Sequence, residues 1–435
     1  MIAALLLSTA LAVQDTTRLT LADAVRRALA SHPSVAAARD NQAAAQASVG
    51  EARAPLFPRL TAGLSATQYK IGNLVYPLSG ISLTNLPLFN STLSQASVSL
   101  GYTLFDFGGR SSQVRLAQAQ ERKAGAALDA ASAALVSRTA NAYLRVLTTR
   151  GVLEAQERAV AALDAEARRV AQLEAQGKAA HVDVLRLAAQ VSRARADEVG
   201  TRAQLDVAER DLAVLVGLPA DTAATWLAPV RLMDTTVADR ATLVATAEQM
   251  SPDVAQARRA AEAAAAGVGA ARSSLLPQLQ LVAAYVENGH TFTGYRPWWN
   301  AGLQLSYPIF TGGSRLYGIR RTEASARAAD EQVRSAEQGA ELSADGALAT
   351  VTAARATVDA LASAVQQSEE VERIRLLSVQ VGSGTETDYL DAEATLLSNR
   401  AALVQARNAE IAARIELARV TGVLTPEWLT RMVAQ

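Results

Sequence analysis

The chain has 435 residues, no cysteine, and 42 basic residues balanced by 42 acidic ones. A net charge of zero gives no electrostatic footprint for nucleic acid, and the lack of cysteine excludes disulfides, thiolate zinc sites and thiol nucleophiles. Aromatic residues are only 4% of the chain while alanine dominates long stretches, a composition typical of long helices packed side by side.

The N-terminal segment is apolar and ends in Ala10-Leu11-Ala12, a small-x-small cleavage pattern. We therefore predict a signal peptide at residues 1–12, with a short buried helix as the alternative. Beyond this segment we expect no apolar run near the roughly 20 residues of a membrane-spanning helix. A membrane form of the chain is then expected to be a β-barrel.

An internal duplication is the strongest feature of the sequence. RAPLFP at 53–58 recurs as RSSLLP at 272–277, an offset of 219, and YTLF at 102–105 recurs as YPIF at 307–310, an offset of 205. The difference, 219 minus 205, leaves 14 additional residues in the first copy. Because length differences concentrate in loops, we assign them to an exposed loop at 73–90.

The duplication predicts two structural repeats joined by a linker. The first covers 13–217, with a β-hairpin at 59–105 and a long helix pair at 109–216. An equatorial linker segment is expected at 218–240. The second repeat covers 241–423, with a β-hairpin at 278–310, a long helix pair at 313–421 and a C-terminal tail at 424–435.

Each repeat opens with short helices, and Pro33 and Pro252 fit the first turn of one helix in each copy. The strands follow, with apolar Val98, Leu100 and Tyr102 alternating with polar or small residues. A period of two places one strand face in an apolar medium and the other in a polar one.

Glycine pairs end the strands at 108–109 and 312–313, and the stretches 109–176 and 313–381 contain no proline. At 1.5 Å per residue, each predicted helix is about 100 Å long. Val160, Leu163 and Ala167 follow the three-four spacing of a coiled-coil seam. A glycine-containing turn separates each long helix from its returning partner.

Four strands per chain are too few to close a barrel, and their edges need cover. Three chains supply twelve strands, within the range of outer-membrane barrels. The aromatic residues Tyr295, Trp298 and Trp299 are placed at the membrane interface. The alternative, the edge of a soluble sandwich, does not explain the length of the flanking helices.

These motifs, doubled in the same order, resemble the outer-membrane efflux protein (TolC-like) family. The resemblance rests on YTLFDFGGR at 102–110, YPIFTGGSR at 307–315, and the turns QGKAAHVDVL and VGSGTETDYLDAEATL. It implies an α+β membrane protein whose duplicated helical hairpins and two β-hairpins form a homotrimer, with a 12-stranded β-barrel in the outer-membrane lipid continuous with a periplasmic 12-helix α-barrel. It also implies a passive exit duct of a tripartite efflux or type I secretion system, with a periplasmic adaptor and an inner-membrane pump.

In that family the helix-to-helix turns form the periplasmic tip, which meets the adaptor and is closed at rest. The resemblance places adaptor contacts in the two turns, at Gly177, Lys178, Gly382, Ser383, Gly384 and Thr385. It places the gate at Asp388 and Asp391, which match the family's paired aspartates, and to these we add Asp183 and Arg186 from the corresponding first turn. Asp388 and Asp391 are three apart on one helix face, and rings of acid favour cations.

Two residues depart from the family pattern at the contact that locks neighbouring helices together in that family. The family arginine two residues after the second-turn glycine is Gly384 here, and the aromatic three residues before that glycine is Val379. A contact from Arg186 to an aspartate is one replacement. The simpler interpretation of Asp183 and Asp388, compatible with a gate, is that they complement the positive helix N-terminus.

Enzymatic features are missing from the sequence. Its three histidines, at 32, 181 and 290, fall in unrelated elements, with His181 expected as an exposed turn residue. No phosphate-binding loop and no nucleophile–base pair is visible, so we predict no enzyme, no cofactor, no metal and no nucleic-acid partner. The alternative function is a periplasmic coiled-coil adaptor or scaffold without a pore.

Overall fold

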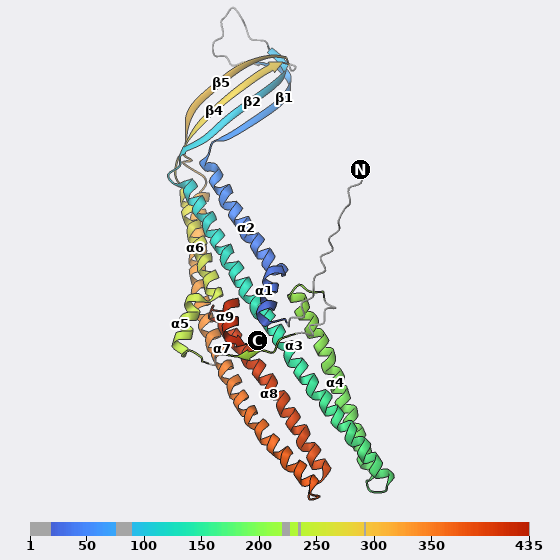
Figure 1. The fold of residues 1–435 in the computed structure, drawn as a ribbon. Helices are drawn as coiled ribbons and strands as arrows, with labels where there is room; N and C mark the ends of the chain where they lie inside the picture. Colours follow the sequence, from blue (N-terminus) through green and yellow to red (C-terminus); the bar gives the residue numbers. More distant parts are fainter. Residues whose placement is uncertain (1–18, 75–88, 220–226, 234–235, 291–292, 435) are drawn as a thin grey trace, which may run out of the picture. The chain divides into compact units, whose positions relative to one another are not determined.

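The computed structural model describes residues 19–74, 89–219, 227–233, 236–290 and 293–434 (Figure 1). The expected signal peptide and most of the expected loop at 73–90 lie outside these residues. The chain divides into two compact units. The strand unit comprises Arg39–Ala127 and Gln256–Ser335, and the helical unit comprises Met1–Ala38, Leu128–Ala255 and Ala336–Gln435. Each unit takes segments from both predicted repeats.

The strand unit carries one antiparallel sheet of order β1-β2-β4-β5 (Figure 1). Its strands are β1 (Arg59–Leu74), β2 (Phe89–Phe105), β4 (Gln278–His290) and β5 (Thr293–Ser306). The central β2–β4 pair joins the two hairpins across nearly 200 residues of sequence, with Val98 opposite Tyr285. Within the described residues, β1 and β5 are the two edges, each paired on one side only.

The strand register aligns the apolar positions of all four strands. Residues directly opposite in an antiparallel pair share a face, and one such row contains Leu60, Leu100, Ala283 and Ala301. The next residue of each strand belongs to the other face, whose row contains Thr61, Ser99, Ala284 and Asn300. The predicted period of two is therefore confirmed and extends across the sheet.

Four helical segments adjoin the strands in this unit. Helices α2 (Pro33–Arg53) and α6 (Pro252–Ser273) precede β1 and β4, with a 3-10 turn η1 at Ala54–Leu56 between α2 and β1. The first parts of α3 (Gly109–Ala175) and α7 (Ser314–Gln380) follow β2 and β5. The Asp106 carboxylate accepts the Arg110 backbone N–H at 2.6 Å, and the Arg110 guanidinium donates to the Pro55 carbonyl at 3.2 Å. The YTLFDFGGR motif thus fixes where strand β2 ends and helix α3 begins.

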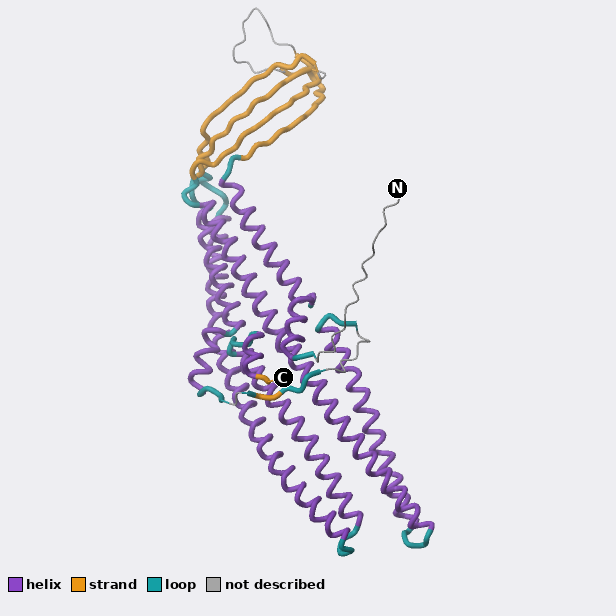
Figure 2. Tube along the Cα trace, viewed as in Figure 1, coloured by secondary structure: helices purple, strands orange, loops and turns teal. Residues whose placement is uncertain are grey.

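In the helical unit, α3 and α7 turn back into α4 (His181–Leu215) and α8 (Glu386–Val420) (Figure 2). Their order is α4-α3-α8-α7. An ion pair of 2.8 Å joins Arg150 of α3 to Glu209 of α4. The Asn408 amide of α8 donates to Thr148 of α3 at 2.8 Å, and α8 and α7 share an apolar seam that includes Leu396 and Val365.

Most of the short elements of the helical unit gather around Tyr143 of α3. They are α1 (Leu21–Ser31), α9 (Pro426–Met432), and the two-stranded sheet of β3 (Arg231–Leu232) and β6 (Val433–Ala434). Helix α5 (Arg240–Met250) instead packs against α7, with Ala247 beside Ala344 in a separate apolar cluster. The Tyr143 hydroxyl lies 2.8 Å from the Leu19 carbonyl and 2.7 Å from the Ala228 carbonyl. Burial raises the pKa of Tyr143 well above its ordinary value, so the hydroxyl stays protonated.

One helix differs from expectation in its hydropathy. Helix α7 contains an 18-residue stretch of mean hydropathy 1.2, of which 11% is buried within the chain. By length and composition alone this stretch is sufficient to cross a bilayer, so the expectation that no such run exists was wrong. One such helix is weak evidence for a membrane span. What the stretch does show is that much of the apolar surface of α7 is not covered by other parts of the chain.

Candidate functional site

Both helix-to-helix turns have the same backbone conformation, with a left-handed glycine at the end of the long helix. Gly177 and Gly382 adopt φ of +71° and +73°, the left-handed region that favours glycine. The next N–H in each turn closes back on the helix, from Lys178 to the Leu173 carbonyl and from Ser383 to the Ser378 carbonyl. These bonds satisfy the last carbonyls of α3 and α7, so each long helix ends abruptly at its glycine.

The second turn positions Asp388 in the first turn of α8. Thr385 caps this helix, its hydroxyl accepting the Asp388 backbone N–H at 3.2 Å. The Asp388 carboxylate lies 3.7 Å from the Arg375 guanidinium of α7. The simpler interpretation of Asp388, a negative charge at a helix N-terminus, is therefore compatible with the geometry, and Arg375 adds a cation from the facing helix.

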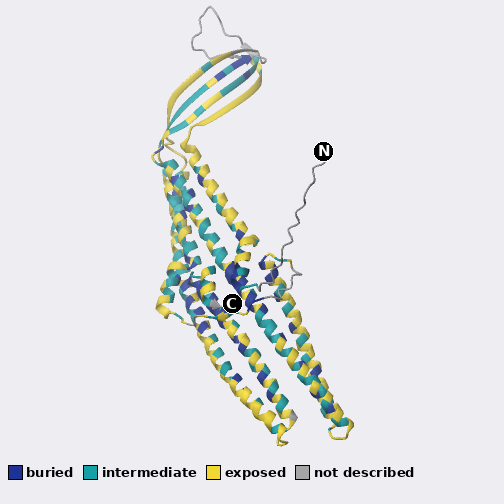
Figure 3. Ribbon diagram, in the orientation of Figure 1, coloured by how far each residue is buried: buried dark blue, intermediate teal, exposed yellow. Residues whose placement is uncertain are grey.

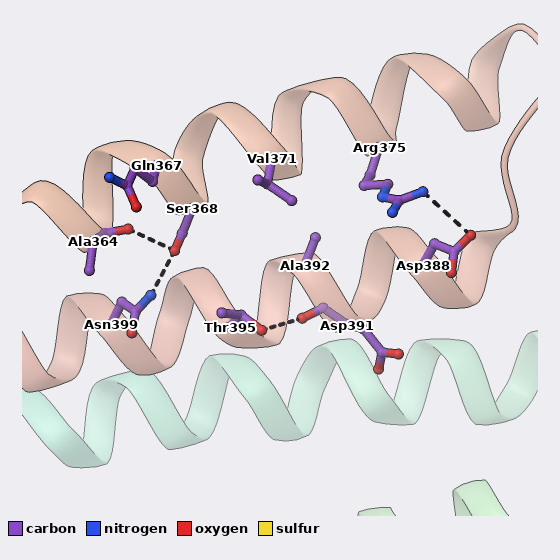
Figure 4. A pocket seen from close by; sticks show the side chains of 10 residues that line it. All are labelled: Ala364, Gln367, Ser368, Val371, Arg375, Asp388, Asp391, Ala392, Thr395 and Asn399. Carbon is purple, nitrogen blue, oxygen red and sulfur yellow. Dashed lines mark hydrogen bonds and ion pairs between the residues drawn. The ribbon is translucent and has the colours of Figure 1, made fainter.

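A groove of about 470 Å³ runs between α7 and α8 beside this pair (Figure 4). Polar side chains from both helices line it, including Ser368, Arg375 and Asn399, and Asn399 donates to Ser368 at 2.6 Å. In Figure 4 Arg375 and Asp388 face each other, whereas the Asp391 carboxylate points away from Arg375. Asp391 is exposed, and none of the ion pairs among the described residues includes it.

The first turn carries a different charge arrangement. Arg186 lies 3.9 Å from Asp183, one turn earlier on α4, so within one chain it does not reach the aspartates of the second turn. His181 is exposed, as expected, and it is the first residue of α4, where its Nδ1 lies 2.7 Å from the Glu174 carboxylate of α3. The cation that bridges two helices at a turn is Arg375, which sequence reasoning missed.

Gly384 is closely approached by the end of α7. A Cβ atom at this position would lie 2.8 Å from the Ser378 Cβ, a distance that forces a shift. The Gly384 N–H also donates to the Ser378 carbonyl at 3.0 Å. The departure from the family arginine thus has a local cause, since the turn is folded tightly against Ser378.

Both turns leave apolar side chains in solvent. Val182 and Leu185 are more than half exposed at the start of α4, as are Leu377 and Val381 at the end of α7. The turn residues Gly177, Lys178, Gly382, Ser383 and Thr385 are exposed as well, and Gly384 is half-buried. Both turns therefore expose apolar side chains beside polar backbone, a combination that suits a docking surface.

The expected interfacial aromatics divide between the two faces of the sheet. Trp299 lies opposite Tyr285 in the apolar rows, whereas Trp298 lies opposite Val286 in the polar rows. The two tryptophans of the predicted girdle therefore lie on opposite faces of the sheet, because adjacent residues of a strand point to opposite faces. The side chain of Tyr295 lies outside the described residues.

A second aromatic group, missed from the sequence, surrounds the junctions between strands and helices. Phe57, Phe105 and Phe107 are more than half exposed there, and Ile309 and Phe310 are 91% and 87% exposed. Their motifs were visible in the sequence as repeat markers, and the structure adds that these residues are uncovered.

Comparison with known proteins decides the family. The profile of the family described as outer membrane efflux protein matches residues 24–218 and 243–423. The chain belongs to this family. The two matched blocks leave out residues 219–242, which fall in and next to the expected linker.

Individual members show how far the similarity extends. The chain is 30% identical over 324 residues to Protein CyaE of Bordetella pertussis, covering 71% of this chain and 64% of CyaE. It is 29% identical over 415 residues to the pyoverdine export outer membrane protein OpmQ of Pseudomonas aeruginosa, covering 92% and 84%. The solved structure of the outer membrane protein VceC of Vibrio cholerae matches with a TM-score of 0.75 at 25% identity, covering 92% of this chain and 96% of VceC.

These comparisons establish what kind of protein this chain is. It is an outer membrane protein of efflux and transport with a TolC-like channel fold. The chain spans less than two thirds of CyaE and most of OpmQ. The alternative function, a periplasmic adaptor without a pore, is set aside by this membership.

Proposed function

We propose that the efflux protein assembles as a homotrimer and serves as the passive exit duct of a tripartite efflux or type I secretion system. Three sheets form a 12-stranded barrel in the outer membrane, and three helical units form a 12-helix barrel in the periplasm. An inner-membrane pump supplies the energy, and a periplasmic adaptor carries the opening signal. The duct itself catalyses no reaction and needs no cofactor.

The observation that carries this proposal is the open, four-stranded sheet. Both edge strands are exposed along almost all of their described length (Figure 3). On the apolar face Leu64 and Trp299 are 88% and 74% exposed. Unpaired strand edges and a bare apolar face are unstable in water, and both are satisfied when sheets close edge to edge within lipid.

The helical unit independently supports lateral assembly. Its helices α4 and α7 both expose apolar side chains, although α7 packs against α5 as well as against α8. Val199, Val207 and Val214 of α4 and Leu342 of α7 are each more than half exposed. The uncovered apolar stretch of α7 fits this role, because it can pack against α4 of a second copy without entering a membrane.

Two groups of exposed aromatic residues on and beside the sheet suggest where the lipid-facing band begins and ends. Tyr285 and Trp299 lie opposite each other near the middle of β4 and β5 on the apolar face, and the exposed group that includes Phe57 and Phe310 lies beyond the strand ends that adjoin the helices. Aromatic side chains favour both membrane–water interfaces. We assign these two groups to the two interfaces, which replaces Trp298 in the predicted girdle.

At the tips we propose a gate and a docking surface. Asp388, Asp391, Asp183 and Arg186 form the charged entrance, where water in the pore solvates the carboxylates. The exposed turns at 177–178 and 382–385 contact the adaptor. A sheet suited to lipid in one unit and charged turns in the other unit together support the proposal of a continuous duct.

Cysteine crosslinking between strand edges tests the trimer. The chain has no natural cysteine, so Thr61→Cys on β1 can be combined in turn with Asn300→Cys, Gly302→Cys and Gln304→Cys on β5. All four positions belong to the same face of the sheet. In membranes, one pairing should give a disulfide-linked ladder that ends at three chains.

The matched control is each single-cysteine variant, which should stay monomeric in denaturing gels. A ladder that continues past three chains, or crosslinking by Thr61→Cys alone, contradicts edge-to-edge closure by three copies. A pair of substitutions on central strands, Ser99→Cys with Ala284→Cys, reports on folding, since these residues face each other within one chain.

A further inference from the structure

The two adjacent tryptophans of β5 have different surroundings. Trp299 belongs to the row of Ala62, Val98 and Tyr285 on the apolar face, where it is largely exposed. Trp298 is half-buried on the opposite, polar face. A membrane anchor needs only one of these positions, so the second indole requires another explanation.

The row that contains Trp298 increases in side-chain size across the sheet. It runs from Gly63 on β1 through Ser97 on β2 and Val286 on β4 to Trp298 on β5. Small residues beside a large one are the usual way in which inward-facing positions of a barrel accommodate bulk. The small residues Gly63 and Ser97 therefore leave space above β1 and β2 on the polar face. When two copies of the sheet meet edge to edge, the Trp298 indole on β5 of one copy can occupy that space on the other.

Neighbouring side chains show that this part of the polar face is already crowded. Val286 is 5% exposed and Asn288 is 8% exposed, whereas the two edge strands are exposed along almost all of their described length. The Gln95 amide donates to the Asn288 side chain at 3.1 Å. The Trp298 Nε1 atom is buried without a hydrogen-bond partner among the described residues, so packing rather than a polar contact holds the ring.

We propose that Trp298 lines the lumen and that its three copies narrow the outer part of the duct. This inference rests on the proposed trimer, in which the polar face of each sheet encloses water. Trp298 sits on an edge strand, so each indole lies beside the β1 edge of the next copy. The resulting constriction limits the passage of bulky solutes, while small ions pass between the rings.

Fluorescence quenching tests which medium each indole contacts. The chain has four tryptophans, so replacing Trp226 and Trp428 by phenylalanine, together with either Trp299 or Trp298, leaves one reporter. In phosphatidylcholine vesicles, acrylamide should quench the Trp298 reporter and brominated lipid should not. The Trp299 reporter should show the reverse. Quenching of Trp298 by brominated lipid overturns the inference.

Conductance then tests the constriction with a matched pair of variants. Both Trp298→Ala and Trp299→Ala are made in the Asp388→Ala, Asp391→Ala background, so that the tips do not limit the current. Trp298→Ala should raise single-channel conductance and reduce exclusion of polyethylene glycols from the outer side, and Trp299→Ala should change neither. Equal effects of the two variants, or no effect of Trp298→Ala, overturn the constriction. Failure of the background protein to form channels would instead contradict the proposed duct.

Discussion

The Arg375 guanidinium of α7 lies 3.7 Å from the Asp388 carboxylate of α8, so the second tip turn contains an ion pair between two helices of one chain. Three residues further along α8, Asp391 has no such cation among the described residues. Arg375 and Asp388 are each about half exposed, and pairs of that kind contribute about 0–1 kcal/mol. The pair can therefore rearrange at low cost, which suits an entrance that opens.

Removal of Arg375 should make the entrance more cation-selective. Arg375→Ala leaves the Asp388 charge uncompensated beside Asp391, so the reversal potential in a KCl gradient should shift toward that of potassium. The matched control is Arg373→Ala on the same helix, since Arg373 pairs with Glu370 one turn earlier. Equal shifts for both variants would argue against a specific role of the Arg375 pair.

Neutralising Asp391 should reduce cation selectivity more than neutralising Asp388. Asp388 already faces the Arg375 guanidinium, whereas Asp391 has no such cation among the described residues, so the ring formed by its three copies is the less compensated one. Reversal potentials of Asp391→Asn and Asp388→Asn in the same gradient check this order. A larger effect of Asp388→Asn would mean that Arg375 points elsewhere in the assembled duct.

A side chain at position 384 should loosen the second turn. In Gly384→Ala the new Cβ would meet Ser378 at 2.8 Å, so the turn must shift. Faster hydrogen–deuterium exchange over residues 378–388 is the expected result. The control is Gly339→Ala inside α7, where nothing lies within 4 Å and the substitution stabilises a helix by about 1 kcal/mol. Unchanged exchange in Gly384→Ala would contradict the close approach.

Glu393 of α8 should make the tip hairpin more stable under mild acid. Burial, with a smaller contribution from the charge of Glu372, raises the pKa of Glu393 above its ordinary value of 4.5. The folded state then holds the Glu393 proton more tightly than the unfolded state does. The resulting stabilisation of the folded state is fully present below pH 4.5 and is lost as the pH rises through the folded-state pKa. Hydrogen exchange of α8 across this pH range should show the trend, and Glu393→Gln should remove it.

Loss of the Tyr143 hydroxyl should destabilise the centre of the helical unit. In Tyr143→Phe the Ala228 carbonyl loses a buried hydrogen bond of 2.7 Å, at a cost of about 1–3 kcal/mol. Thermal unfolding should begin at a lower temperature than in the control Tyr317→Phe, whose ring is 66% exposed. Identical unfolding of the two variants would show that water replaces the hydroxyl.

Local patterns in the sequence predicted most of the elements. The period of two in β2 and β5 and the proline-free stretches of α3 and α7 are properties of short windows, and the structure contains the expected strands and helices. The opposite faces of Trp298 and Trp299 were also readable, since adjacent strand residues cannot share a face. The period of two, applied to Trp298 and Trp299, would have placed them on opposite faces of the sheet.

Pairings between helices could not be predicted in the same way. Arg375 and Asp388 are separated by a turn, and their contact depends on the register in which α8 packs on α7. The His181–Glu174 contact depends likewise on the geometry of the first turn. The two compact units divide α3 and α7 in mid-helix, where no change in composition marks a boundary.

Single-channel conductance of the purified protein in a planar bilayer tests the duct most directly. The wild type should insert and show a small, cation-selective conductance, which rises in the variant carrying Asp388→Ala and Asp391→Ala because the charged entrance is opened. A conductance that the two substitutions leave unchanged would place the gate elsewhere in the duct. A protein that never inserts and stays monomeric in buffer without detergent would contradict the proposed channel itself.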